Sequence, residues 1–269
     1  MTRGAPTDVL GAGFAALCAA FRIPVVVHLA LVAVLVAVAV PLSTRGYLAT
    51  DTQPSARRPA RNALRAWTEP RTLALGIFVL SMAFSEGTGN DWLAAAMIEG
   101  HHISEAAGSL SFAIFVAAMT LGRWFGPPLV NRYGPRLVTR ASGILAMSGL
   151  AITIFGPHHV LALVGVVTWG LGTAMGFPLG ISAAADDPNH AAIRVSVVSS
   201  IGYTAFLAGP PALGLLANHV GILRSLSITL VVVAVGLLFT TSFPTARDFG
   251  GPRIRPVPRC GTNAGKRRR

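Results

Sequence analysis

The stretch LGRWFGPPLVNRYGPRLVTR, residues 121–140, decides the architecture, because it lies between two long apolar segments. These segments are Ala107–Leu121 before it and Leu137–Phe155 after it. Two apolar segments of membrane length with a short connection indicate a pair of membrane-spanning helices. The connection carries three arginines: Arg132, Arg136 and Arg140. Because short loops rich in Lys and Arg stay in the cytoplasm, this stretch predicts a cytoplasmic loop.

The composition excludes a soluble globular domain. Hydrophobic residues make up 52% of the chain and charged residues 12%, and the mean hydropathy is +0.61. A soluble domain has about 25% charged residues. Apolar segments of about 18 residues or more recur along the chain, each long enough to span a bilayer. The sequence therefore predicts an all-α, polytopic membrane protein whose first partner is the lipid bilayer.

The basic charge follows the predicted topology. A net charge of +12 would favour nucleic-acid binding in a soluble protein. Here the charges gather outside the apolar segments, in Arg45–Arg71, Arg132–Arg140 and Arg247–Arg269. This distribution is typical of cytoplasmic loops and tails. It predicts that the linker and the C-terminal tail are cytoplasmic, and it gives no support for a nucleic-acid partner.

Polar residues suggest where the helices end. Thr72–Ser85 begins a span, and the sequence EGTGNDW at Glu86–Trp92 is expected to interrupt it. Met97–Ala106 is expected to form an exposed turn with solvated histidines at His101 and His102. Ala107–Phe125 is then the next helix. The expected interruption rests on Gly87 and Gly89, since glycine often breaks a helix.

The basic connection resembles a known signature. Residues 127–136, PPLVNRYGPR, are similar to the loop signature G-x-L-a-D-R-x-G-R-R of the major facilitator superfamily of transporters. The matching residues are Leu129, Arg132, Gly134 and Arg136. Asn131 stands where the family has an acid, and Pro127 stands in place of the first glycine. The resemblance implies that the family's charged interaction is altered here, and that Asn131 caps a helix or accepts a hydrogen bond.

Three further segments extend the resemblance. Glu86–Trp92 matches E-G-x-x-x-D-W, a pattern of the seventh helix in one bacterial branch of the superfamily. Gly170–Pro178 and Ile201–Gly214 look like the tenth and eleventh helices of that branch. The resemblance thus implies a multi-pass protein of the cell membrane, the inner membrane in a bacterium. It implies a four-part division: 9–42 the last helices of an incomplete N-terminal bundle, 43–71 a cytoplasmic linker, 72–243 a six-helix C-terminal bundle, and 244–269 a basic, disordered cytoplasmic tail.

Glu86 is the main candidate for a functional charge. A carboxylate within a membrane span is costly, so it faces a cavity, pairs with a cation or binds a proton. The alternative is that Glu86 lies hydrated at the membrane boundary. Asp91 is expected to be hydrated at the outer surface. Trp92 either stacks on a substrate or belongs to the interfacial aromatic belt, which is the commoner role of such a residue.

Arg123 and a set of glycines and prolines have structural interpretations. Arg123 is expected to snorkel to the interface, and pairing with an acid across the bundle is the alternative. Small residues allow close helix packing, and proline bends a helix. The residues predicted to provide such packing or bending are Gly172, Gly176, Pro178, Gly202, Gly209, Pro210, Pro211 and Gly214.

The sequence favours secondary active transport of a small solute by alternating access, with proton coupling as one form of it. No catalytic constellation, metal-ligand spacing or cofactor motif is present in the sequence, so an enzyme, a metal site and a cofactor have no positive support. The segments that resemble the family correspond to its later helices, and none of them corresponds to its first four. This leaves two alternatives: a truncated, non-transporting scaffold or decayed fragment, and a transporter completed by a separate N-terminal half. A membrane sensor acting through the tail Lys266–Arg269 is a weaker hypothesis.

Overall fold

The computed structural model describes residues 24–44, 65–188 and 190–245 of the 269-residue chain. The chain divides into two compact units, Met1–Ala60 and Arg61–Arg269. The described part of the first unit is one helix, α2 (Val25–Thr44), which is apolar along Ala30–Leu42. Residues 9–23 of the predicted incomplete bundle, residues 45–64 of the predicted linker and residues 246–269 of the predicted tail lie outside the described residues.

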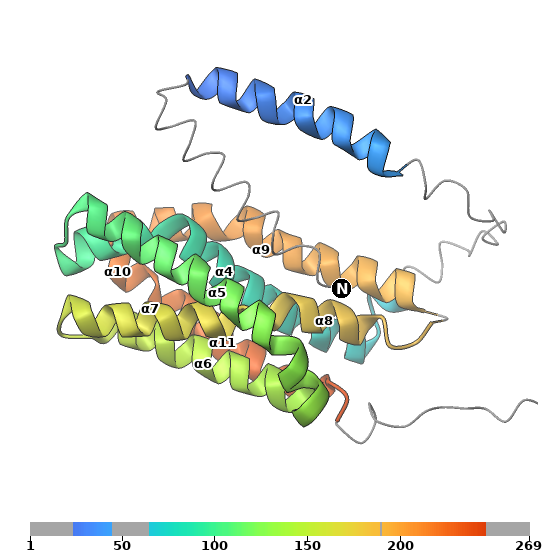
Figure 1. The fold of residues 1–269 in the computed structure, drawn as a ribbon. Coiled ribbons are helices and arrows are strands. Elements are labelled where there is room, and N and C mark those ends of the chain that lie inside the picture. The colour runs from blue at the N-terminus through green and yellow to red at the C-terminus, as the bar shows by residue number, and fades with distance from the viewer. Residues whose placement is uncertain (1–23, 45–64, 189, 246–269) are drawn as a thin grey trace, which may run out of the picture. The chain divides into compact units, whose positions relative to one another are not determined.

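The second unit is helical throughout its described residues (Figure 1). Its elements are α4 (Pro70–His101), α5 (Glu105–Tyr133), α6 (Pro135–Phe155), α7 (His159–Thr173), α8 (Gly176–Ala184), α9 (Ala191–Val220), α10 (Ile222–Ser225), α11 (Ser227–Leu238) and the 3-10 turn η1 (Phe239–Ser242). They form 6 helical spans that are long and apolar enough to cross a membrane, with α7 and α8 sharing one span and α10 to η1 another. The predicted all-α, polytopic fold is confirmed.

Helix α4 is the centre of the bundle. It packs against α5, α9 and α11, and 67% of its most apolar stretch is buried, against 22% for α9. In one buried cluster Leu93 and Met97 of α4 pack with Phe115 and Trp169. The two aromatic rings contact edge to face, with their centroids 5.1 Å apart. On another part Phe78 and Met82 pack with residues of α8 and α11. Such apolar interiors fix the helix faces, so they also fix which polar side chains turn inward.

The expected interruption within α4 was wrong. The helix runs without a break through EGTGNDW to His101, and Met97 is buried rather than in a turn. Gly87 and Gly89 do not break the helix, because each faces an aromatic ring of a neighbouring helix, Phe206 and Phe115 respectively. Glycine here removes a side chain at a crowded helix contact, which is a common use of glycine in membrane bundles.

The basic connection is also mostly helical. Helix α5 continues through Pro127 and Pro128 to Tyr133, and α6 begins at Pro135. Gly134 alone joins the two helices with φ of 83°, a conformation that glycine adopts at little cost. It is also the N-cap residue of α6, which has no side-chain cap hydrogen bond. The expectation that Asn131 caps a helix is therefore wrong for α6.

Glycine and proline have different consequences in the last spans. Helix α7 ends at Thr173 and α8 begins at Gly176, so the tenth span of the resemblance is broken at Ala174 and Met175. Helix α9, by contrast, continues through Pro210 and Pro211. Prolines are tolerated in membrane helices where neighbouring groups satisfy the freed backbone.

Candidate functional site

Glu86 lies at the midpoint of α4. At about 1.5 Å per residue it is about 24 Å from either end of the helix. Its side chain is 13% exposed. Both observations favour a charge inside the bundle over a hydrated boundary residue, and an ion-pair partner offsets the cost of such a charge.

That partner is Arg123 of α5. Its guanidinium donates to the Glu86 carboxylate, with Nη2 and Oε1 2.7 Å apart. Arg123 lies ten residues before the end of α5 at Tyr133, which corresponds to about 15 Å along the helix. The expected snorkelling of Arg123 is therefore wrong, and the alternative of pairing across the bundle is the observed arrangement.

A third element completes the site at the break between α7 and α8. Arg123 also donates from Nε to the carbonyl oxygen of Ala174, at 3.4 Å. In an unbroken helix this carbonyl would accept from the N–H four residues later. That residue is Pro178, which has no N–H. The arginine thus supplies the missing donor, and one side chain joins the acid of α4 to the freed backbone between α7 and α8.

Buried hydroxyl groups lie beside the ion pair along α4. Ser85 accepts a 2.8 Å hydrogen bond from the indole Nε1 of the fully buried Trp169. The hydroxyls of Thr88 and Thr229 are 3.2 Å apart. These residues were not predicted from the sequence, since single Ser and Thr residues in an apolar segment carry no distinctive pattern.

The other two candidates on α4 lie outside this pair. Asp91 is exposed, as expected for a hydrated acid. Trp92 is partly buried and packs beside Gly214 of α9, where an added Cβ would lie 3.3 Å from its ring. Its indole N–H is buried and has no hydrogen-bond partner among the described residues. The structure therefore separates both residues from Glu86, and roles for them stay predictions.

The predicted signature residues surround the junction of α5 and α6. Leu129 and Tyr133 are exposed, and the guanidinium of Arg132 lies 5.3 Å from the centre of the Tyr133 ring. Arg136 is partly buried. In the described part of the chain none of the signature arginines forms an ion pair. The signature is thus structurally separate from the Glu86–Arg123 pair.

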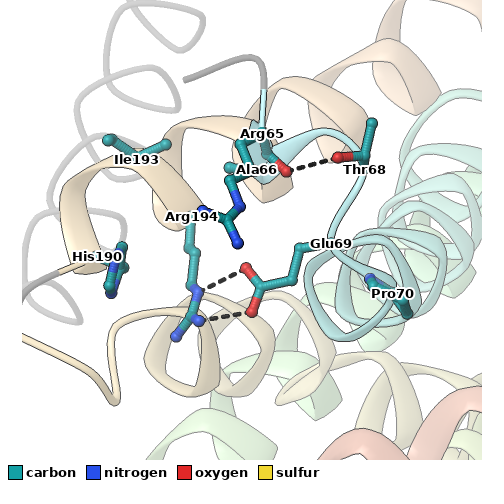
Figure 2. Close-up of a pocket in the computed structure, with 8 residues that line it drawn as sticks. All are labelled: Arg65, Ala66, Thr68, Glu69, Pro70, His190, Ile193 and Arg194. Atoms are coloured by element: carbon teal, nitrogen blue, oxygen red, sulfur yellow. Dashed lines mark hydrogen bonds and ion pairs between the residues drawn. The ribbon is translucent and has the colours of Figure 1, made fainter. Parts of the chain in front are cut away.

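A second cluster of charges lies where α4 and α9 begin (Figure 2). Arg194 of α9 forms two hydrogen bonds with Glu69, which directly precedes α4, at 2.8 and 2.5 Å. Thr72 donates to the same carboxylate at 2.8 Å. Glu69 and Arg194 border a cavity of about 630 Å³ that Arg65 and His190 also line. The pair fixes the beginnings of two helices that are far apart in the sequence.

The pairing changes the acidity of Glu69. Burial raises the pKa of the Glu69 carboxyl, and the hydrogen bonds and positive charge of Arg194 lower it by more. The net result is a pKa below the ordinary value of 4.5. Because the folded state has the lower pKa, the pair contributes its full stability above pH 4.5. That contribution is lost as the pH falls through the folded-state pKa.

The substitution Glu69→Gln is expected to lower the free energy of unfolding by about 1–2 kcal/mol at neutral pH, since Arg194 loses a charged partner in a partly exposed site. The difference from the unaltered protein should shrink as the pH falls below 4.5, the ordinary pKa. Thermal unfolding of both proteins in detergent, at neutral pH and at a pH below 4.5, measures this difference in stability. Glu99→Gln is the matched control, because Glu99 is an exposed acid of the same helix. Equal pH dependence of the two variants would contradict the assignment.

One histidine expectation also needs correction. His101 is not simply solvated, because its Nε2 lies 2.8 Å from the carbonyl oxygen of Thr153 on α6. His102 is exposed, with φ of 54° where α4 ends. In the described residues no group of three or more His, Cys, Asp or Glu side chains is arranged to hold a metal ion.

With this geometry established, comparison with known proteins gives consistent matches. The model of one family, the Major Facilitator Superfamily, matches residues 9–210. The chain is 32% identical over 212 residues to the uncharacterized transporter y4wD of Sinorhizobium fredii, covering 78% of this chain and 55% of that protein. It is 31% identical over 169 residues to membrane protein MosC of Rhizobium meliloti, covering 62% of this chain and 41% of that protein. It therefore spans about half the length of the curated relatives that it matches.

Solved structures show the same fold at low identity. The structure of the E. coli fucose:proton symporter FucP matches with a TM-score of 0.66 at 15% identity, covering 81% of this chain and 55% of that one. A structure of FucP in the outward conformation matches with a TM-score of 0.63 at 14% identity, covering 73% and 48%. At such identities the likeness concerns the arrangement of the helices.

Proposed function

The chain belongs to the Major Facilitator Superfamily, and from this membership we propose that it takes part in the transport of a small solute by alternating access. The six apolar spans among its described residues make it a multi-pass membrane protein. Relatives whose names call them transporters support the proposal. The arrangement of the chain that we propose is the division into linker, six-helix bundle and tail given above, with linker and tail in the cytoplasm.

The observation that carries the proposal is the ion pair between Glu86 and Arg123. Charges at mid-membrane depth are expensive and mark transport pathways or proton relays. Transporters of this kind bind their substrates near the bilayer midplane, where broken helices present backbone groups. The pair lies at the middle of α4 and is joined to the carbonyl of Ala174 at the α7–α8 break, which supports such a role. We therefore assign substrate or proton contact to Glu86, with Asp91 and Trp92 as further candidates on the same helix.

Proton coupling is the form of transport that fits this pair. A proton on Glu86 would remove its negative charge and weaken its bond to Arg123, and alternation between these two forms is the coupling that we propose. The structurally similar protein FucP is a fucose:proton symporter, and we extend the coupling, but not the sugar, to this chain. Bending at Gly172, Gly176 and Pro178, and at the glycine and proline residues of α9, would allow the spans to move.

The test is a transport assay on proteoliposomes that contain the chain. Monosaccharides, amino acids and carboxylates are applied in turn, and the substrate-driven current is recorded on a solid-supported membrane. At least one class should give a current in the unaltered protein. Glu86→Gln should reduce it at least about tenfold, a barrier change of about 1.4 kcal/mol, because the glutamine cannot exchange a proton.

Glu99→Gln is the control for this experiment, since it removes an exposed acid near the end of the same helix. It should keep the current. An equal current from Glu86→Gln would remove Glu86 from the mechanism. If the folded, unaltered protein gave no current with any class, current-generating transport by this chain alone would be contradicted and the scaffold hypothesis favoured. Co-expression with a separate N-terminal half would then show whether a partner restores the current.

A further inference from the structure

An apolar groove runs along the outer side of α5 and α6. It encloses about 450 Å³. Its walls are apolar and aromatic side chains of the two helices: Leu121, Phe125, Leu129, Tyr133, Leu137 and Leu145. All six are exposed. The groove is therefore a preformed apolar surface that the bundle leaves open.

The floor of the groove is set by glycine. Gly122 and Gly126 of α5 lie against Ala174 and Met175 at the break between α7 and α8, where an added Cβ on either glycine would collide with them. The missing side chains let α5 approach the break closely and leave a hollow between its larger residues. The groove is thus a property of the helix packing.

The length of the groove matches one leaflet of a bilayer. Along α5 it extends from Leu121 to Tyr133, which is twelve residues or about 18 Å. Half of a hydrocarbon core is about 15 Å. The groove reaches Tyr133 at the end of α5, so it opens at the helix junction, where a lipid head group would lie.

The charge at that opening is positive and unbalanced. Arg132 and Arg136 lie within two residues of Gly134, Arg140 lies in the second turn of α6, and none of them forms an ion pair among the described residues. Residues 106–185 of the sequence contain no Asp or Glu. The guanidinium of Arg132 lies 5.3 Å from the centre of the ring of Tyr133, which itself lines the groove. The apolar groove and a cationic group are therefore in contact.

From this combination we propose that the groove binds one anionic phospholipid. An acyl chain lies between α5 and α6, and the phosphate lies against Arg132 and Arg140. An uncharged lipid or an apolar polypeptide segment would fill the groove but would leave the arginines unmatched. Basic groups at a membrane surface attract anionic lipid, and the groove adds a defined place for the chain. The proposal does not depend on transport activity.

The experiment measures lipid retention by native mass spectrometry of the full chain in mild detergent. The protein is incubated with phosphatidylglycerol or with phosphatidylcholine of the same acyl chains. The unaltered protein should retain one phosphatidylglycerol, and phosphatidylcholine much less. The double substitution Arg132→Gln with Arg140→Gln should reduce phosphatidylglycerol retention at least about tenfold. Inorganic phosphate should not displace the lipid, because it cannot occupy the groove.

Two further variants keep the test specific. Arg224→Gln is the matched control, since Arg224 is an exposed arginine beside the other glycine junction, at Gly221, and it should leave retention unchanged. Ala141→Phe places a ring in the groove and should reduce retention of phosphatidylglycerol although the arginines remain. Thermal unfolding of each variant checks that it is folded. Equal retention of both lipids, or unchanged retention in the double or the Ala141→Phe variant, would overturn the proposal.

Discussion

Replacement of Arg123 by glutamine is expected to lower the free energy of unfolding by about 2 kcal/mol, because the largely buried Glu86 carboxylate loses its charged hydrogen-bond partner. Glu86 would keep its position at the middle of α4, 13% exposed, without a cation. The carbonyl of Ala174 would also lose the Nε donor that replaces the missing N–H of Pro178. Both losses arise from one side chain, so the effect should be large for a residue that is itself 40% exposed.

A double-mutant cycle isolates the ion pair from other effects of the substitution. The combination of Glu86→Gln and Arg123→Gln should recover most of the lost stability, since two neutral amides replace the unpaired charge. Unfolding of the four proteins is followed in detergent by circular dichroism as denaturant is added. If Arg123→Gln alone unfolded like the unaltered protein, or if the two substitutions were additive, the ion pair would not stabilise the bundle.

The second large effect is expected for Gly172→Ala in α7. The added Cβ would lie 2.6 Å from the Cα of Ala146 and would also collide with its backbone nitrogen. Backbone atoms of α6 cannot rotate away as a flexible side chain does, so the two helices must separate. We expect a loss of about 3 kcal/mol, at the upper end of what overpacking costs.

Gly209→Ala is the matched control on α9. There the new Cβ would meet only the ring of Phe84 at 3.3 Å, and a side chain can move by a few tenths of an ångström. The gain in helix propensity from glycine to alanine offsets part of that cost, so the change in stability should stay below about 1 kcal/mol. Similar losses for Gly172→Ala and Gly209→Ala would contradict the view that α6 and α7 are in backbone contact.

The six spans of the second unit were predictable because an apolar segment of about 18 residues or more rarely forms anything but a membrane-spanning helix. Their ends were not. Glu86–Trp92 contains two glycines and two acids, a composition typical of a loop, yet it lies within α4 because the glycines fit against rings of other helices. The predicted loop that contains Pro127 and Pro128 is likewise helical, since α5 continues to Tyr133. In a packed bundle the neighbouring helices determine whether glycine or proline ends a helix.

Of the two residues in the Glu86–Arg123 ion pair, only Glu86 was predictable as a site residue. Glu86 was identifiable from its charge within an apolar span. Arg123 is 37 residues away in sequence, and nothing in the sequence distinguishes pairing from snorkelling until α4, α5 and the α7–α8 break are placed together. The bond between Arg194 and Glu69 spans 125 residues and was not predicted at all. Pro178 was one available signal, since a proline leaves an unpaired carbonyl four residues earlier.

The unequal lengths of the helices have a consequence for the membrane in which the protein works. Helix α4 has 32 residues and α6 has 21, which correspond to about 48 Å and 32 Å. The hydrocarbon core is about 30 Å thick. The longer helix accommodates a thicker bilayer by reducing its tilt, whereas α6 has almost no length in reserve. Hydrophobic mismatch in bilayers of longer-chain lipids therefore falls on α6, whose backbone contact with α7 transmits the strain to the rest of the bundle.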